Sequence, residues 1–228
     1  MKLRWIVAGG VYLLGLVWNA SAFTMPAYNR TSYVATVVEP VGDLYRYSYT
    51  VWNLSTPGLH GELGMVWPSI IGWEIPLNSP SDVWEVTFPA TWNYRFLSAD
   101  EYENLYGVPN PFNAPWVLQW YDAELSNPVN SEKMIVPEGF NAFFNDDEYE
   151  PYAEHFGFWS HLGPVDGPYA ALWLDFFREI GDPPLPAGGT AGGTVPGIPY
   201  RRMPDSGASA LMLMAIGLFG MGALRKLG

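Results

Sequence analysis

The densest group of side chains that could bind a ligand is acidic. Asp146, Asp147, Glu148 and Glu150 follow Asn145 in one short run. Carboxylate oxygens are the ligands that Ca²⁺ prefers, so these four residues are the calcium candidates of the chain. Their spacing lacks the D-x-D-x-D-G turn of a calcium loop, and a solvated acidic loop explains them better. We therefore predict no metal and no cofactor.

The histidines do not form a recognisable metal site. His155 and His161 are six positions apart, which on a regular strand places both on one face. That spacing is too long for a compact pair of ligands, no third ligand is evident, and His60 is isolated. We expect exposed histidines on a polar face.

Sequence motifs for catalysis are missing. The chain has no G-x-S-x-G, no H-E-x-x-H and no glycine-rich phosphate loop. It also has no cysteine, which excludes thiolate chemistry and disulfides. Glycoside hydrolysis needs two carboxylates about 5–10 Å apart, and nothing in the sequence places such a pair. We expect no enzymatic activity, and a secreted hydrolase is the less favoured alternative.

The aromatic residues carry the other binding hypothesis. The chain has 11 Trp and 14 Tyr, and exposed rings of this kind stack on sugar faces. Aromatic residues on strands more often fill a core. A carbohydrate-binding module that acts on exopolysaccharide is therefore the alternative function, to be decided by which rings lie outside the core.

The elements that must position these residues are mostly strands. Leu44–Trp52 alternates, with Tyr45, Tyr47, Tyr49 and Val51 on one face. Many short strands separated by Pro, Gly, Asn and Asp predict an antiparallel β-sandwich. The other expected strands are 32–38, 70–75, 83–88, 92–96, 116–121, 133–136, 156–162 and 169–177. Two short helices are expected, at 99–106 after an N-cap at Ser98 and at 145–155.

The N-terminus has the features of a secretory signal peptide. Lys2 and Arg4 precede an apolar run, and the small residues Ala20 and Ala22 then form a cleavage site. We expect cleavage after Ala22, so residues 1–22 take no part in the fold. Residues 23–207, between the leader and the apolar run, hold 23 acidic and seven basic residues, a net charge of −16. Such a surface disfavours nucleic acid.

The C-terminus has the features of a membrane anchor. Residues 208–224 carry no charge and are apolar on every side, which predicts a single transmembrane helix. Arg225 and Lys226 close the run, so the basic end 225–228 should lie in the cytoplasm and the domain outside. The Gly/Pro/Thr-rich stretch 187–202 is interpreted as a linker.

The segment before the anchor resembles a bacterial sorting signal. Pro204, Asp205, Ser206 and Gly207, followed by the apolar run and the basic pair, resemble the PEP-CTERM class in its Val-Pro-Asp-Ser-Gly variant, with Met203 in the place of Val. The resemblance implies recognition of residues 203–228 by an exosortase, a membrane-embedded protease. It also implies a Gram-negative envelope and an exopolysaccharide context. A GPI-type signal fits less well because the polar spacer is missing.

A looser resemblance covers most of residues 42–186. Segments such as YRYSYTVWN and GDPPLP are similar to the bodies of small PEP-CTERM proteins, which implies an immunoglobulin-like sandwich. We therefore expect an extracytoplasmic domain at 23–186. The expected function is that of a non-enzymatic surface or matrix protein, first anchored in the inner membrane and then processed at its tail.

Overall fold

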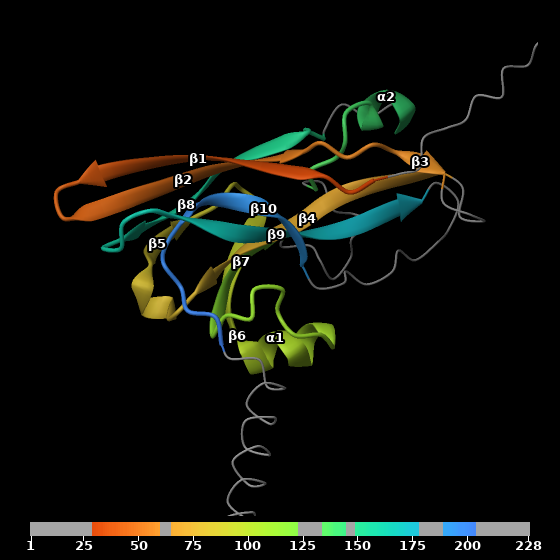
Figure 1. Cartoon of the computed structure of the whole chain (residues 1–228). Coiled ribbons are helices and arrows are strands. Elements are labelled where there is room, and N and C mark those ends of the chain that lie inside the picture. The colour runs from red at the N-terminus through yellow and green to blue at the C-terminus, as the bar shows by residue number, and fades with distance from the viewer. Residues whose placement is uncertain (1–28, 60–64, 123–133, 145–148, 178–188, 204–228) are drawn as a thin grey trace, which may run out of the picture.

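The computed structural model describes residues 29–59, 65–122, 134–144, 149–177 and 189–203. Within these ranges the chain forms two antiparallel β-sheets, one above the other in Figure 1, with helix α1 beneath the lower sheet. The strands are β1 (Ser32–Val41), β2 (Leu44–Asn53), β3 (Gly58–Leu59), β4 (Met65–Leu77), β5 (Trp84–Thr87), β6 (Trp92–Ser98), β7 (Trp116–Asp122), β8 (Tyr152–Ser160), β9 (Val165–Phe177) and β10 (Thr190–Gly197). The helices are α1 (Ala99–Tyr106), α2 (Phe140–Phe144) and a 3₁₀ turn at Pro80–Asp82.

The two sheets differ in size and in strand order. The four-stranded sheet has the order β1-β2-β8-β5. The six-stranded sheet has the order β10-β9-β4-β7-β6, and β3 pairs with β4. Their facing surfaces share one aromatic core, so the predicted all-β, two-sheet architecture is confirmed.

Strand β2 shows how the sequence builds the interface between the sheets. Tyr47, Tyr49 and Val51 are buried, whereas the residues between them are partly exposed. The Tyr49 ring lies 5.1 Å from the ring of Trp73 in β4, and Trp73 stacks on Trp120 of β7 at 4.4 Å. Burial of such large rings is the main favourable term in a domain without disulfides.

One buried amide ties the sheets together. Asn53, at the end of β2, donates from Nδ2 to the carbonyls of Pro68 and Ile135, both at 2.8 Å. Its Oδ1 accepts the backbone N–H of Ser55. Because its three bonds satisfy buried backbone groups, the side chain links β2 to β4 at low desolvation cost.

The interpretation of residues 187–202 as a linker is wrong in its described part, residues 189–202. Residues Thr190–Gly197 form β10, which pairs antiparallel with β9 along Val165–Ala171. Val195 and the following Ile198 are buried in the aromatic core. The domain therefore extends beyond residue 186, and the described chain remains part of it up to Met203.

Residues 198–203 continue from β10 as what we call the exit strap. Asn78 donates to the carbonyl of Pro199 and accepts the backbone N–H of Arg201 at 2.6 Å. Met203 donates its N–H to the carbonyl of Asn113, and the Asn113 amide donates to the Met203 carbonyl at 2.8 Å. Tyr200 packs against the cluster that contains Tyr102 and Phe112, so the strap is held against the domain along its length.

The local predictions had mixed outcomes. Helix α1 forms at 99–106 with Ser98 as its N-cap, as predicted. The helix expected at 145–155 is wrong in its described part, because Tyr152–His155 belong to β8. The strand expected at 133–136 reduces to one bridge between Ile135 and Ile70.

None of the helices in the described ranges has the length and apolarity to cross a membrane. The expected signal peptide (1–22) and the expected transmembrane helix (208–224) lie outside the described residues.

Candidate functional site

The outer face of the four-stranded sheet carries side chains in rows across its strands. Strand alternation directs one residue in two away from the core, and antiparallel register sets which residues are neighbours. The outer face consists of Tyr33, Ala35, Val37 and Glu39 of β1, Arg46, Ser48, Thr50 and Trp52 of β2, Tyr152, Gly157 and Trp159 of β8, and Trp84 and Thr87 of β5.

An aromatic row crosses three strands at one end of this face. Tyr33 is the register partner of Trp52, and Trp52 is the partner of Tyr152. The rings of Trp52 and Tyr152 stack with centroids 4.6 Å apart. Tyr33 is 55% exposed and the other two are half-buried, so the row presents ring surface to solvent.

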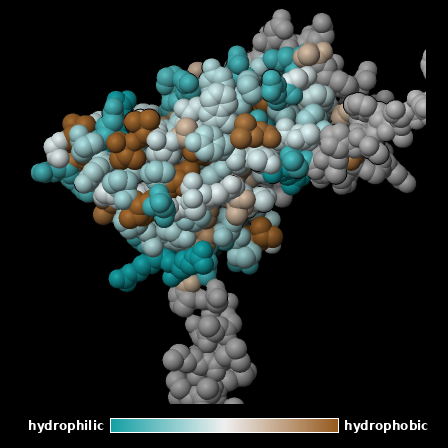
Figure 2. Space-filling model, turned by 45° about the horizontal axis from the view of Figure 1, so that its top comes forward, coloured by the Kyte–Doolittle hydropathy of each residue, from teal (hydrophilic) through white to brown (hydrophobic). Residues whose placement is uncertain are grey.

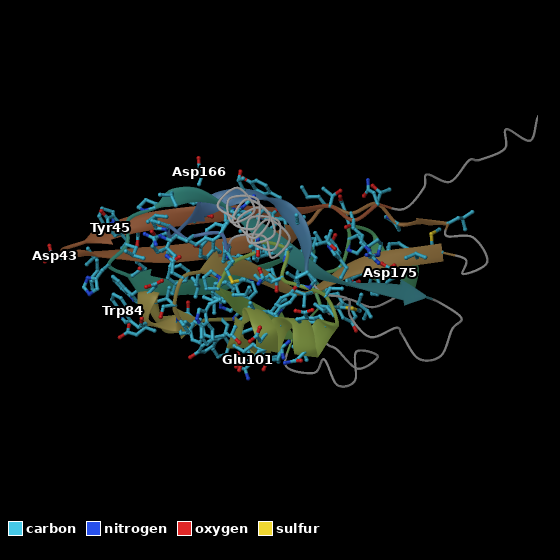
Figure 3. All side chains as sticks on the ribbon, turned by 60° about the horizontal axis from the view of Figure 1, so that its bottom comes forward. Asp43, Tyr45, Trp84, Glu101, Asp166 and Asp175 are labelled. Atoms are coloured by element: carbon cyan, nitrogen blue, oxygen red, sulfur yellow. The ribbon has the colours of Figure 1, made fainter. Side chains whose placement is uncertain are left out.

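A second aromatic group lies at the other end. Trp159 is the register partner of Trp84, and the Trp84 ring lies 4.9 Å from the ring of His161. Figure 3 places Trp84 at the same end of the molecule as Asp43, in the turn between β1 and β2. Glu39 and Arg46 complete this row. Trp52 and Arg46 are six positions apart on β2, so the two aromatic groups are about 20 Å apart.

A hollow of about 360 Å³ lies between the two aromatic groups. Most of its wall is made of small or polar side chains on the four strands: Ala35, Val37, Arg46, Ser48, Thr50, Thr87, Glu154 and His155, with Tyr49 and Phe156 beneath. Gly157 lies in the same row as Ser48 and Thr87. A Cβ there would be 2.3 Å from the Tyr47 carbonyl oxygen, so only glycine fits.

A bulge in β8 widens this hollow at one side. Glu154 and His155 together stand opposite Thr50, and His155 has φ 71°, a left-handed conformation. The same two residues line a smaller hollow of about 200 Å³, which also contacts Trp92, Tyr149 and Tyr152. The two hollows therefore share the wall that the bulge forms. We call the larger one, together with the aromatic groups on either side of it, the outer-face groove. His155 and His161 are both exposed, as expected; His155 lies at the bulge within β8, and His161 directly follows the strand.

The surface chemistry of this side of the molecule is mixed. Figure 2 turns the top of Figure 1 forward and shows small hydrophobic patches separated by pale and hydrophilic residues. A continuous apolar patch would indicate a protein or lipid partner. Rings separated by hydroxyl and charged groups fit a ligand that is itself partly apolar and rich in hydroxyls.

A separate polar network lies inside the molecule, between the larger sheet and α1. Glu74 of β4 is fully buried and accepts hydrogen bonds from the Tyr102 hydroxyl at 2.8 Å and from the Gln119 amide at 2.6 Å. Arg95 donates to Gln119 at 2.8 Å and to Tyr106 at 2.9 Å. The N–H of Gly189 donates to the Tyr102 hydroxyl.

Burial raises the pKa of Glu74 to about 7, against the lowering effect of the bonds from Gln119 and Tyr102 and of Arg95. A raised carboxyl pKa is often found at an active site. Here both oxygens already accept hydrogen bonds from the protein, and no solvent reaches the side chain. The network therefore links α1 and Gly189, the residue before β10, to the larger sheet.

Most residues predicted to be functional lie outside the described residues: Ala20, Ala22, His60, Asp146, Asp147, Glu148, Pro204, Asp205, Ser206, Gly207, Arg225 and Lys226. Glu150 is described and exposed, and its carbonyl accepts the N–H of Val136. Over the described ranges, no three His, Cys, Asp or Glu side chains gather where a metal ion could bind.

Comparisons with known proteins do not add to this picture, since no family model, no curated protein and no solved structure matches the chain.

The sequence contains part of the signal for the groove. The alternation of β2 indicates which of its residues share a face. It does not indicate that Tyr33, Trp52 and Tyr152 stand side by side, because that depends on β8 pairing with β2 across a long separation in sequence.

Proposed function

We propose that this chain is an exported surface protein without enzymatic activity, and that its outer-face groove binds an extended polysaccharide. The observation that carries the binding proposal is the aromatic row Tyr33–Trp52–Tyr152 beside a hollow on an open sheet face. Flat rings match the apolar faces of sugar rings, and the hydroxyl and charged groups between them can bond to sugar hydroxyls.

The export proposal is supported by the two ends of the sequence. The basic and apolar leader with Ala20 and Ala22, and the tail with Pro204–Gly207, the apolar run and Arg225–Lys226, support secretion, inner-membrane anchoring and processing by an exosortase. The protein then functions at the cell envelope or in the extracellular matrix. An immunoglobulin-like variety of sandwich remains a prediction.

The length and openness of the groove favour a linear chain over a single sugar. The two aromatic groups are separated by about 20 Å along β2, a span that several sugar rings would fill. The net charge of −16 over residues 23–207 favours a neutral or cationic polysaccharide, because an acidic one would be repelled.

The carboxylates near the groove bear on the alternative of a hydrolase. Of the described residues lining the larger hollow, only Glu154 has a carboxylate, whereas glycoside hydrolysis uses a pair about 5–10 Å apart. Glu150 joins Glu154 at the smaller hollow. Release of reducing ends from a bound polysaccharide would contradict the non-enzymatic part of the proposal.

The binding test is affinity electrophoresis in gels that contain a neutral linear β-glucan, chitosan or alginate. We expect retardation by at least one of the first two and none by alginate. Trp52→Ala should weaken binding about tenfold, since a ring covered by ligand contributes about 1.5 kcal/mol. Leu105→Ala is the control, because Leu105 is 48% exposed on α1, away from the groove.

Two results would overturn the binding proposal. One is equal migration in all gels, and the other is an equal effect of Trp52→Ala and Leu105→Ala. Circular dichroism of each variant checks that both remain folded.

A further inference from the structure

The exit strap determines where the domain ends relative to the tail. Met203, the last described residue, is bonded to Asn113 through both its N–H and its carbonyl. Asn113 has φ 52°, a conformation that asparagine adopts more readily than most residues, so this loop is built to hold the strap. The chain therefore has no free spacer before residue 204.

The distance from the strap to the apolar run is short. Only Pro204–Gly207 separate Met203 from Ala208, where the uncharged run begins. An extended chain spans at most about 3.6 Å per residue, so Met203 and Ala208 lie within about 18 Å of each other. This upper limit holds for every conformation of the intervening residues.

The strap also determines which side of the domain lies nearest to the tail. Figure 1 shows the chain passing from β10 down to the end that contains α1 and β6, on the opposite side from β1 and β2. Tyr200 of the strap packs in the same cluster as Leu97, Tyr102 and Phe112, which belong to that end. The outer face of the four-stranded sheet points the other way.

We infer that the end of the domain formed by α1 and the loop 107–115 is a membrane-apposed surface, held against the bilayer that the tail enters, with the outer-face groove turned away from it. This inference rests on the proposed anchoring by the tail. Arg201 and Arg202 are exposed at the end of the strap, where cations are attracted to anionic headgroups. The acidic residues Asp100, Glu101 and Glu103 of α1 would be repelled by such headgroups. The end with α1 is therefore held near the bilayer by the short connection to the tail, and not by binding of α1 to lipid.

The orientation has a consequence for the groove. A surface protein whose binding face is turned outward can contact a polysaccharide that extends away from the cell. The same protein on a long linker would sample all orientations.

The test uses the full chain without its leader, inserted in lipid nanodiscs that contain a headgroup-labelled acceptor lipid. The chain has no cysteine, so one introduced cysteine gives a single fluorescent label. Glu103→Cys lies on α1, and Val37→Cys lies on the outer face, where Val37 is 59% exposed. We expect energy transfer to the lipid to be several-fold stronger from position 103 than from position 37.

A long Gly/Ser segment inserted after Met203 should abolish this difference. The same segment inserted at Gly42, in the turn between β1 and β2, is the matched control and should leave the difference intact.

Equal energy transfer from both labels in the anchored protein would overturn the orientation. So would a difference that survives the insertion after Met203, because it would show adhesion of the domain itself. Failure of the chain to enter nanodiscs would overturn the anchoring proposal instead.

Discussion

Glu74 makes the stability of the domain depend on pH. Its pKa rises from 4.5 to about 7 because the side chain is fully buried. Between pH 4.5 and pH 7, Glu74 is therefore protonated in the folded state and ionised in the unfolded state. The free energy of unfolding therefore falls as pH rises from about 4.5 to 7 and is constant with respect to this group above that range. At about 1.4 kcal/mol per pKa unit, the contribution lost is about 3 kcal/mol.

Glu74→Gln removes this titration. We expect the unfolding free energy of the variant minus that of the natural protein to become about 3 kcal/mol more positive when the pH is raised from 4.5 to 8. This change does not depend on which of the two proteins is the more stable at pH 4.5. Urea unfolding of both proteins at the two pH values measures the change. Glu103→Gln, on the exposed side of α1, is the matched surface control. A stability difference that stays constant over this range would show that Glu74 is not protonated in the fold.

Gly189 is required by the same carboxylate. A Cβ at this position would be 2.0 Å from Oε1 of Glu74, and its N–H donates to the Tyr102 hydroxyl. Composition alone makes residues 187–189 look like part of a spacer, whereas the glycine is needed because a side chain has no room there.

Strand β10 is the element whose role is most sharply testable. A chain ending at Met203 should fold, whereas a chain ending at Gly189 loses Val195 and Ile198 from the core and leaves β9 as an unpaired edge. Burial of these two side chains contributes about 2 kcal/mol each, so we expect the shorter chain to be destabilised by at least 4 kcal/mol. Thermal unfolding followed by circular dichroism compares them. Equal midpoints would mean that residues 190–203 act as a linker after all.

The sequence predicted the elements that have a clear local pattern. The alternating Tyr residues of β2 and the Ser98 cap of α1 are of this kind, since side-chain burial and a backbone bond at the cap act over a few residues. Strand β10 has no such local pattern. Glycine is required in it where a side chain from a distant part of the sequence fills the space that a Cβ would occupy. A Cβ at Gly192 would be 2.2 Å from the Tyr169 ring.

Of the predicted sorting and calcium residues, Met203 and Glu150 are described, and the others lie outside the described residues. The groove was predictable only as a hypothesis about exposed rings. Its assembly depends on the neighbours β2 and β8, which come from distant parts of the chain, and no local pattern encodes such a pairing.

At the scale of the whole molecule, charge is the dominant feature. With a net charge of −16 over residues 23–207, the compact state is destabilised by self-repulsion. We expect the unfolding midpoint of residues 23–203 to rise by a few degrees when NaCl is increased from low to physiological concentration at pH 7, since salt screens exposed charges.

The same measurement near pH 4.5, where many carboxylates are protonated, should show a much smaller effect of salt. A midpoint that falls with salt at pH 7 would indicate that attractive ion pairs, such as Arg30 with Asp175 at 2.6 Å, outweigh the repulsion.

The position of β10 at the end of the domain also sets an order of events during biosynthesis. The larger sheet receives its last strand from the residues that leave the ribosome, and any translocation channel, after all the others. Until Met203 has emerged, β9 lacks its partner and the core lacks Val195 and Ile198. Completion of the fold and arrival of the tail are therefore nearly simultaneous, so a protein truncated before β10 would lack both and would remain open to proteolysis.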